Sequence, residues 1–357
     1  MNPMLPSEIT ESRAITPDDD PSSGPKISVI IPIYGNVGDL DRLIAALMRQ
    51  SLKPHEIIVV DSSPQHLAHP PEGHNVKYIK NPIDLALSGD YNCGAQHATG
   101  DYLLLMQQDC LPGSDTDLEQ NYSLLTPGRS AVTSSVTLPV EYWEKYNFWG
   151  QALMARWVGT FKQGISGKFD LIRADVFRKI KGYDPVTFST AGEDMDLCLR
   201  LMQHGEVFVA PSQIIHFHNQ SKRTRCIDIF KKHYQLAESF GALFRKWGFR
   251  LRYIPYAAHG AHHLAKYLYL LLPLIVVFPL RTLAFLLVAT NFTNIEVWRI
   301  RSSKKFIFLV LNPVLFLVGV LATLKGFITG KQLYSVNKSG NKLRAKTAVQ
   351  DDFLNNC

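Results

Sequence analysis

Short β-branched runs alternate with helix-spaced apolar residues over the first third of the chain, and this alternation limits the fold most. Residues 27–31 (ISVII) and 56–61 (EIIVVD) are typical of buried strands. Residues 76–79 and 102–106 are two further strand-like runs, and residues 88–98 favour a helix. An apolar series at helical spacing lies between the first two strands: Leu40, Leu43, Ile44, Leu47 and Met48. The alternation predicts a mostly parallel sheet with covering helices.

Three polar residues follow the predicted strands directly. They are Tyr34, Asp61 and Asp109, and we expect them to converge, because parallel sheets bind ligands at the carboxyl ends of their strands. Taken singly, Asp61 is also explained as the cap of a turn and Asp109 as an ordinary turn residue. A functional Asp109 would hold a divalent cation that bridges a diphosphate. Its neighbours Gln107 and Gln108 are amides, which predicts modest metal affinity.

Three carboxylates fall within four positions at residues 193–196 (EDMD), where a helix over 194–204 is predicted to begin. Like charges this close repel each other, and matching the helix dipole needs only one or two acids. At least one is therefore expected to have a function, such as general base for a hydroxyl. Further on, His216 and His218 alternate on a predicted strand and point to opposite faces. One of them would reach the site as a metal or phosphate ligand, although a buried structural histidine is the default for either.

Residues 130–190 show little regular pattern. Glycines punctuate them, and four aromatic residues cluster there, which a packed aromatic layer explains better than a binding surface: Tyr142, Trp143, Trp149 and Trp157. The five cysteines are scattered and form no CxxC pair, so a zinc ribbon, a thioredoxin motif and a disulfide framework are excluded. A reducing compartment fits this usage.

Charge is distributed very unevenly. Residues 221–357 carry 21 Lys and Arg against 5 Asp and Glu, whereas the rest of the chain is acidic. This basic block needs an acidic partner. It also contains apolar stretches at 267–290 and 306–324, which favours anionic membrane lipid and argues against nucleic acid. The second stretch is long enough to span a bilayer. The first stretch could span it only if the Arg281 side chain reaches the membrane interface.

The topology of these stretches is ambiguous from sequence. Basic residues lie both between the two stretches and after them, which conflicts with two simple spans. Prolines would let either stretch bend back as a re-entrant or interfacial helix, and a buried hairpin of a soluble protein is a further alternative. The N-terminus lacks the apolar run of a signal peptide. The expected organisation is a disordered lead, a catalytic domain, basic connecting helices, membrane-associated helices and a basic tail, at residues 1–25, 26–225, 226–262, 263–326 and 327–357.

Several segments occur in the order found in family 2 glycosyltransferases, which are inverting nucleotide-sugar transferases, and the chain resembles that family over residues 26–225. The matching segments are ISVIIPIYGN (27–36), EIIVVD (56–61), TGDY (99–102) followed by Asp109, GYD (182–184) and GEDMDL (192–197). The resemblance implies an α/β fold of the GT-A type, a mostly parallel sheet with covering helices, followed by a C-terminal hydrophobic helical membrane region.

The resemblance also implies roles for individual residues. Asp194 would be the catalytic base, and Glu193 would orient the acceptor or the base. Asp109 would bind Mg²⁺ or Mn²⁺, with His216 or His218 near the diphosphate. Gln107 stands at the first Asp position of the family's DXD motif, which puts the contacts normally made there in doubt. The residues expected to bind the nucleotide sugar are Pro32, Tyr34, Asn36, Asp61, Asn92 and Gln108.

The expected function is transfer of a sugar from a nucleotide-diphosphate donor to a hydroxyl of a membrane-held glycan or glycolipid, in polysaccharide or O-antigen synthesis. The Gln-Asp pair and the HFHN run at 216–219 resemble rhamnosyltransferase-type members. One alternative is a polyprenyl-phosphate sugar synthase, whose anionic acceptor needs no base. Another is a non-enzymatic membrane adaptor that keeps the fold. We expect the protein at the cytoplasmic membrane, with its catalytic domain facing the cytosol.

Overall fold

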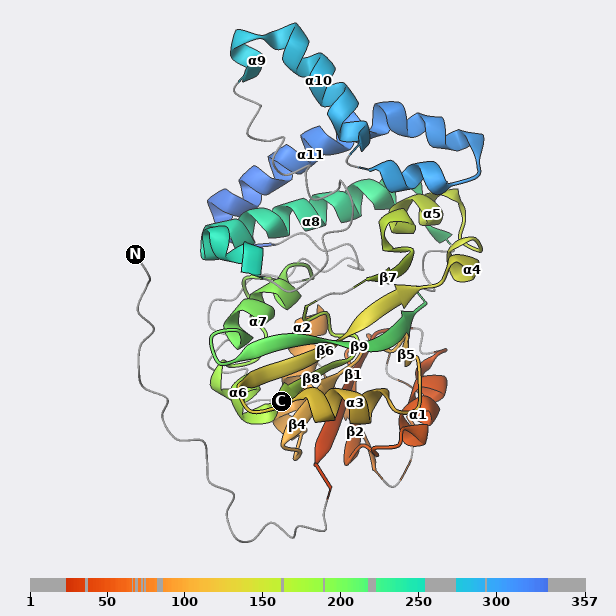
Figure 1. Ribbon diagram of the computed structural model, residues 1–357, viewed down its shortest axis with the longest axis vertical. Coiled ribbons are helices and arrows are strands. Elements are labelled where there is room, and N and C mark those ends of the chain that lie inside the picture. Colours follow the sequence, from red (N-terminus) through yellow and green to blue (C-terminus); the bar gives the residue numbers. More distant parts are fainter. Residues whose placement is uncertain are drawn as a thin grey trace.

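The computed structural model of the chain describes most of residues 24–332 and consists of a mixed sheet below a group of long helices (Figure 1). Most of the predicted disordered lead and most of the basic tail lie outside the described residues. Also outside them are residues 36–37, 66, 68–69, 72, 74, 82–85, 162–163, 189, 218–222, 254–273 and 293.

Nine strands form one sheet in the described part of the chain. Their order is β3-β2-β1-β4-β8-β6-β9-β5, and β7 pairs with β6 outside this path. The strands are β1 (Ile27–Ile33), β2 (Glu56–Asp61), β3 (Val76–Lys80), β4 (Tyr102–Leu105), β5 (Cys110–Pro112), β6 (Arg129–Leu138), β7 (Gly159–Phe161), β8 (Asp170–Arg173) and β9 (Glu206–His216).

The sheet is parallel where the sequence alternates between strands and helices. β1 pairs in parallel with both β2 and β4, and β2 pairs in parallel with β3. This confirms the predicted α/β sheet with covering helices. Beyond β4 the sheet becomes mixed, because β8 pairs antiparallel with β4 and with β6, whereas β6 and β9 are parallel to each other.

Strand β6 lies in the stretch that sequence reasoning described as irregular. Its sequence, RSAVTSSVTL, is rich in small hydroxyl residues, yet most of the strand is buried. Hydrogen bonds satisfy these hydroxyls inside the protein: the Ser134 and Ser212 hydroxyls lie 2.7 Å apart, and Asn121 Nδ2 donates to Ser134 Oγ at 2.8 Å. A strand buried through polar contacts shows no hydrophobic periodicity, so the pattern did not reveal it.

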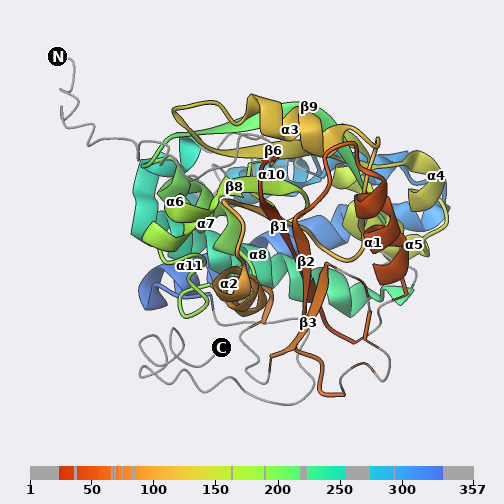
Figure 2. The same ribbon diagram turned by 90° about the horizontal axis from the view of Figure 1, so that it is seen from below.

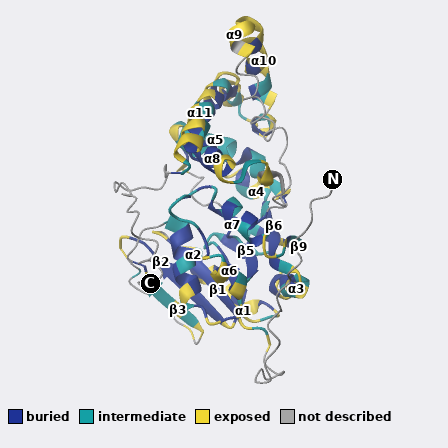
Figure 3. Cartoon of the chain, turned by 90° about the vertical axis from the view of Figure 1, so that its left-hand side faces the viewer, coloured by how far each residue is buried: buried dark blue, intermediate teal, exposed yellow. Residues whose placement is uncertain are grey.

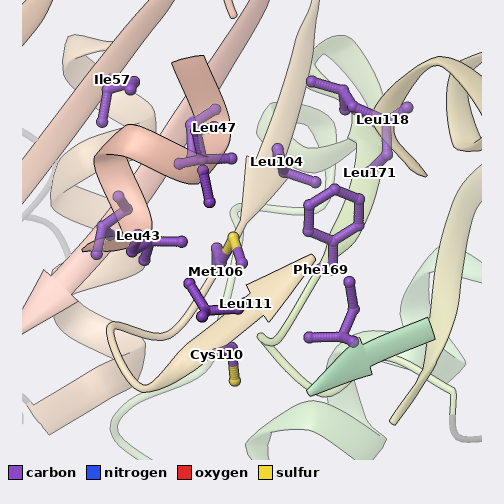
Figure 4. Close-up of a cluster of buried hydrophobic side chains, with 14 of the residues drawn as sticks. Leu43, Leu47, Ile57, Leu104, Met106, Cys110, Leu111, Leu118, Phe169 and Leu171 are labelled. Atoms are coloured by element: carbon purple, nitrogen blue, oxygen red, sulfur yellow. The ribbon is translucent and has the colours of Figure 1, made fainter. Parts of the chain in front are cut away.

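Helices cover both faces of the sheet, and Figure 2 shows α1 and α3 on one side and α2, α6 and α7 on the other. Figure 4 shows the first core, where α1 places Leu43 and Leu47 against Leu104 of β4 and Leu171 of β8. The second core lies between the opposite face of the sheet and α2, α6 and α7. These helices are α1 (Leu40–Arg49), α2 (Ala86–His97), α3 (Asp117–Leu124), α6 (Ala174–Lys179) and α7 (Glu193–Leu201).

The aromatic residues after β6 form the packed layer that was expected. Trp143 is buried, and Tyr142, Trp149 and Trp157 pack beside it, against Phe308 and other residues of the C-terminal region. The elements that carry these aromatic residues are α4 (Val140–Trp143), α5 (Phe148–Met154) and the 3₁₀ turn η1 (Ala155–Trp157). The layer therefore joins the sheet to the helices above it.

The long C-terminal helices pack on this layer and on α7. α8 (Cys226–Trp247) lies beside α11 (Phe308–Thr329), as Figure 1 shows. Gly241 and Gly326 permit this contact, since a Cβ atom at either one would collide with backbone of the opposite helix. The remaining elements are 3₁₀ turns η3 (Gly248–Tyr253), η5 (Ile295–Arg299) and η6 (Ser303–Ile307), and helices α9 (Leu274–Val277) and α10 (Pro279–Phe292).

Helix α11 and the turn before it form a continuous apolar segment, Ser303–Thr329, which is 27 residues long and meets the length and composition needed to cross a membrane. The expected apolar stretch at 267–290 is not one helix: α9 and α10 meet at Phe278, and residues 267–273 lie outside the described part. Many residues of α10 and α11 are exposed, as the colours of Figure 3 show, and many of these exposed residues are large and apolar. This surface is consistent with membrane association.

Candidate active site

The carboxyl ends of β1, β2 and β4 lie at one edge of the sheet, because these strands are mutually parallel. Tyr34 directly follows β1, Asp61 is the last residue of β2, and Asp109 lies in the turn between β4 and β5. The structure therefore brings the three predicted strand-end residues to the same edge. Pro32 belongs to the buried end of β1, where it pairs with Val60.

Asp61 is fully buried and accepts several hydrogen bonds. Its Oδ1 accepts from the Ser63 amide at 2.9 Å, and its Oδ2 accepts from the Leu67 amide at 3.2 Å and from the Tyr78 hydroxyl. Burial raises the pKa of this carboxyl, but hydrogen bonds from Ser63, Tyr78 and Leu67 outweigh it, so the net pKa is lowered. Asp61 thus caps the turn after β2, and as a carboxylate it also orders the loop at the edge of the site.

A second buried acid near this loop was missed from the sequence. Asp90 of α2 accepts from Ser62 Oγ at 2.7 Å and from Asn81 Nδ2 at 2.8 Å. Ser63 Oγ in turn accepts from the Gly35 amide at 2.8 Å. These bonds connect the loops after β1, β2 and β3. Asp90 lies inside a helix of mixed polarity, where the sequence offers no signal that would single it out.

Asp109 and His216 lie close together at the strand ends, on the side away from Asp61. His216 Nε2 lies 3.2 Å from Asp109 Oδ2, and the antiparallel pairing of β5 with β9 places Cys110 opposite His216. One ligand atom from each of these three residues lies within 4.8 Å of the others. Burial lowers the pKa of His216, although the Asp109 charge opposes it, so the imidazole is neutral at pH 7. His218 lies outside the described residues.

The three acids at the start of α7 have different environments. Asp196 is fully buried and makes three polar contacts that tie α7 to its surroundings. Its Oδ2 lies 2.8 Å from Arg200 Nε, and its Oδ1 contacts Lys246 Nζ at 2.7 Å and Trp247 Nε1 at 2.8 Å. Asp196 is therefore structural. Glu193 and Asp194 have no ion pair among the described residues.

Asp194 lies against a buried pair of stacked tyrosines. The Tyr183 hydroxyl donates to Asp194 Oδ1 at 3.3 Å, and the Tyr91 and Tyr183 ring centroids are 5.4 Å apart. Burial raises the pKa of Asp194 well above its ordinary value, and the nearby Glu193 raises it further. Burial also raises the pKa of Glu193. A carboxyl with a raised pKa is suited to accept a proton near neutral pH.

The sequence did not point to a loop that lies between two halves of the site, the Asp109–His216 pair and the acids Glu193 and Asp194. Asp170 at the start of β8 accepts from the amides of Ser166 and Gly167 at 2.7 and 2.6 Å, which shapes this loop. The loop carries Lys168, whose charge lowers the pKa of Asp194 and also the pKa of His216. Lys168 is thus within electrostatic range of both halves. A lone lysine in an irregular stretch gives no sequence signal.

The remaining predicted nucleotide-binding residues are placed as follows. Both ends of the Asn92 side chain bond the backbone of Tyr183, at 3.0 Å to its carbonyl and 2.8 Å from its amide. These two bonds connect α2 to the segment before α7, so Asn92 positions the part of the site that carries Glu193 and Asp194. Gln108 lies beside Asp109 and is half-buried. Asn36 lies outside the described residues.

Comparison with known proteins agrees with this fold. Residues 28–181 match the family model described as glycosyl transferase family 2. The chain is 28% identical over 200 residues to the putative glycosyltransferase EpsE of Bacillus subtilis (strain 168), which covers 52% of this chain and 69% of that protein. These findings define the class: the protein is a glycosyltransferase.

A solved structure shares the architecture. The mannosyltransferase PcManGT from Pyrobaculum calidifontis, in complex with GDP-Man and Mn²⁺, superposes with a TM-score of 0.53 at 15% identity, over 85% of this chain and 88% of that one. The fold is accordingly of the GT-A type. The match to the family 2 glycosyltransferase model is limited to residues 28–181.

Proposed function

We propose that the protein is an inverting glycosyltransferase, which moves a sugar from a nucleotide-diphosphate donor to a hydroxyl of a membrane-held glycan or glycolipid. One observation carries this proposal. The Asp109–His216 pair and Asp194, a carboxyl with a raised pKa, both lie within electrostatic range of Lys168. Direct displacement at an anomeric carbon requires groups that stabilise an anionic leaving group and a base that accepts the proton of the attacking hydroxyl.

The acid at the start of α7 acts as the general base. Asp194 takes the proton of the attacking hydroxyl, and Tyr183 positions its carboxylate through the Oδ1 contact. Glu193 keeps the proton affinity of Asp194 high and orients the acceptor. At the strand ends, Asp61 and Tyr34 line the nucleotide pocket together with Pro32 and Gln108. Lys168 balances the negative charge that develops on the leaving diphosphate.

The residues at Asp109 fit a divalent cation. The carboxylate of Asp109 and the neutral imidazole of His216 are metal ligands, and Mg²⁺ and Mn²⁺ both accept carboxylate oxygen. Cys110 is a poor third ligand, because burial raises the pKa of its thiol and hard cations disfavour sulfur. When bound there, the cation would neutralise charge on the diphosphate. PcManGT was solved with Mn²⁺ and GDP-Man, which supports this choice of cofactor and donor class.

The membrane context follows from the C-terminal helices. The apolar segment Ser303–Thr329 and the exposed apolar side chains of α10 support residence at the cytoplasmic membrane, with the catalytic domain in the cytosol and anionic lipid near the basic residues. We keep the boundary of the catalytic domain near residue 225, since α8 begins at Cys226. The rhamnosyltransferase subclass rests on sequence resemblance alone.

The test is a donor screen with the full chain in detergent. Hydrolysis or transfer from a panel of nucleotide sugars, including GDP-mannose and dTDP-rhamnose, is measured with Mn²⁺, with Mg²⁺ and with a chelator. We expect one donor to be turned over, metal dependence that Asp109→Asn weakens, and a product of inverted anomeric configuration by NMR. Asp115→Asn, at an exposed surface acid, is the matched control. Absence of turnover with every donor would refute the proposal.

A polyprenyl-phosphate sugar synthase is separated by the product of the same screen, since its sugar would be esterified to phosphate. The non-enzymatic adaptor predicts no turnover with any donor, and the family match of residues 28–181 argues against it.

A further inference from the structure

A small cavity lies at the junction between the catalytic sheet and the membrane-associated helices. It has a volume of about 60 Å³ and is lined by residues of α5, η1, α8, η5 and α11. This is about twice the ~30 Å³ that one water occupies in the liquid. Apolar side chains such as Phe308 and Leu315 form the wall on the α11 side, so the cavity adjoins the surface that carries the exposed apolar residues.

The polar wall of this cavity is unusually basic for an interior site. Arg156, Lys232 and His233 line it, whereas Glu296 is acidic among the described lining residues. Burial and the neighbouring Arg156 charge lower the pKa of Lys232 and outweigh the opposing effect of the Glu193 charge. The same two causes lower the pKa of His233 to about 4. Arg156, Lys232 and His233 are each partly buried, and two cations held this close together favour an anion between them.

The hydrogen-bonding groups also favour an oxyanion. Arg156 stays charged at any working pH and offers donors in a fork that matches phosphate geometry. His233 is neutral, and its buried Nε2 has no hydrogen-bond partner among the residues that the structure describes. The Lys232 ammonium donates to Gln235 Oε1 at 3.1 Å, which leaves further donors on the same nitrogen.

The cavity is coupled to the proposed acceptor side of the active site. Lys232 and Glu193 influence each other's pKa, so the two charges are close neighbours. Gln235, one helical turn after Lys232, donates to the Thr190 carbonyl at 3.2 Å, in the segment that leads into α7. A group bound in the cavity would therefore lie between the lipid-facing helices and the catalytic acids.

We propose that Arg156, Lys232 and His233 form a phosphate-binding subsite, which holds the phosphate or diphosphate through which a lipid carries the acceptor sugar. This inference rests on the proposed function and names its acceptor class: a sugar hydroxyl attached to a polyisoprenoid phosphate. The lipid chain leaves the subsite along α11, and the sugar extends past Lys232 toward Asp194. The head group of an ordinary anionic phospholipid presents the same chemistry and is the competing source.

The experiment measures equilibrium binding of radiolabelled farnesyl diphosphate to the full chain in detergent micelles, with farnesol, phosphatidic acid and inorganic pyrophosphate as competitors. We expect farnesyl diphosphate to bind, and Arg156→Gln or Lys232→Gln to weaken binding about tenfold or more. Lys232→Arg, which keeps the charge, should restore much of it. Arg301→Gln removes an exposed cation near the same helices and should leave binding unchanged. Thermal melting of each variant verifies that it folds.

Unchanged affinity in a folded Arg156→Gln protein would overturn the subsite. Equal competition by phosphatidic acid would overturn the acceptor assignment in favour of a phospholipid head group, and equal competition by pyrophosphate would overturn the role of the lipid chain. The donor screen reports on the proposed function separately. Turnover without farnesyl diphosphate binding refutes the subsite alone, whereas binding without any turnover leaves the subsite standing and refutes the catalytic proposal.

Discussion

At the scale of single residues, neighbouring carboxylates have different roles because their surroundings differ. Asp196 is held by Arg200, Lys246 and Trp247, whereas Asp194, two positions earlier, contacts the hydroxyl of Tyr183. The first arrangement stabilises charge and fixes α7. The second leaves a carboxyl whose proton affinity is high, which is the property that a base requires.

Asp194→Asn is expected to reduce transfer about 100- to 10,000-fold with little change in donor binding, as is typical when a general base is removed. The measurement is kcat and KM with saturating donor, and Asp115→Asn is the control. Because the pKa of Asp194 is raised, the base is protonated at low pH, and activity should rise with pH through that raised pKa. Wild-type turnover in the variant, or a flat acid limb, would contradict this role.

Glu56 illustrates a stabilising acid. Burial alone would raise its pKa, but hydrogen bonds from Lys77, Thr99 and Ser28 lower it to about 2. The folded pKa lies below the ordinary 4.5, so the stabilisation is present above pH 4.5 and is lost as pH falls toward 2. We expect Glu56→Gln to lower the melting temperature at pH 7, with a smaller difference from wild type at pH 3. A constant difference across this range would show that charge is not the cause.

The sequence predicts some of these residues and not others, for physical reasons. The strand-end acids Asp61 and Asp109 follow apolar runs, so topology predicts where they meet. In the sequence, only the spacing of Asp196 and Arg200 hints that Asp196 is structural, because its other two partners, Lys246 and Trp247, come from the distant α8. Lys232 belongs to a basic block that suggests only a lipid surface, and it is the packing of α8 that turns this side chain inward.

At the scale of elements, the contact between α8 and α11 depends on two glycines and a buried ion pair. Gly241 and Gly326 let the backbones approach, and Lys325 Nζ lies 2.7 Å from Glu238 Oε1, whose side chain is fully buried. A polar network joins α10 to α11 in a similar way: Asn291 donates to the Leu309 carbonyl at 3.3 Å. Pro313 lacks the amide that would otherwise bond that carbonyl.

Gly326→Leu should force α11 away from α8, since even a Cβ atom there meets the Glu238 carbonyl and the Ala242 amide. Overpacking of this kind costs about 1–3 kcal/mol. We expect a lower melting temperature in detergent and reduced transfer, although no residue of the proposed site has changed. Leu321→Ala on the exposed side of the same helix is the control. Equal stability of the glycine variant and wild type would mean that the helices separate without consequence.

At the scale of the whole molecule, the sheet and the C-terminal helices α10 and α11 form two ends of one elongated body, as Figure 3 shows. Exposed apolar side chains are concentrated on α10 and α11, whereas the core of the sheet is buried. Such a surface is unfavourable in water, and burial in lipid would remove this cost. Basic residues near these helices would add electrostatic attraction to an anionic leaflet.

Membrane fractionation tests this arrangement. We expect the full chain to pellet with membranes, to stay there in about 1 M NaCl, where the screening length is only ~3 Å, and to be released by detergent. Protease treatment of inside-out and right-side-out vesicles then reports the side on which the catalytic domain lies. Release by salt alone would leave only surface attraction, and recovery in the soluble fraction would refute membrane residence.

The hydrogen bonds of Gln332, just beyond α11, affect the choice of acceptors that can react. Its amide donates to the Thr187 carbonyl at 2.8 Å, and its Oε1 accepts from the Thr190 amide at 3.0 Å, two residues before the turn at Gly192 that begins α7. The segment that carries the proposed base is therefore bonded to the residue that follows α11. If the bilayer sets the depth of α11, it also sets the distance between Asp194 and the lipid surface. A glycan would then react when its terminal hydroxyl lies at this distance. Addition of the next sugar would move the new terminal hydroxyl beyond Asp194.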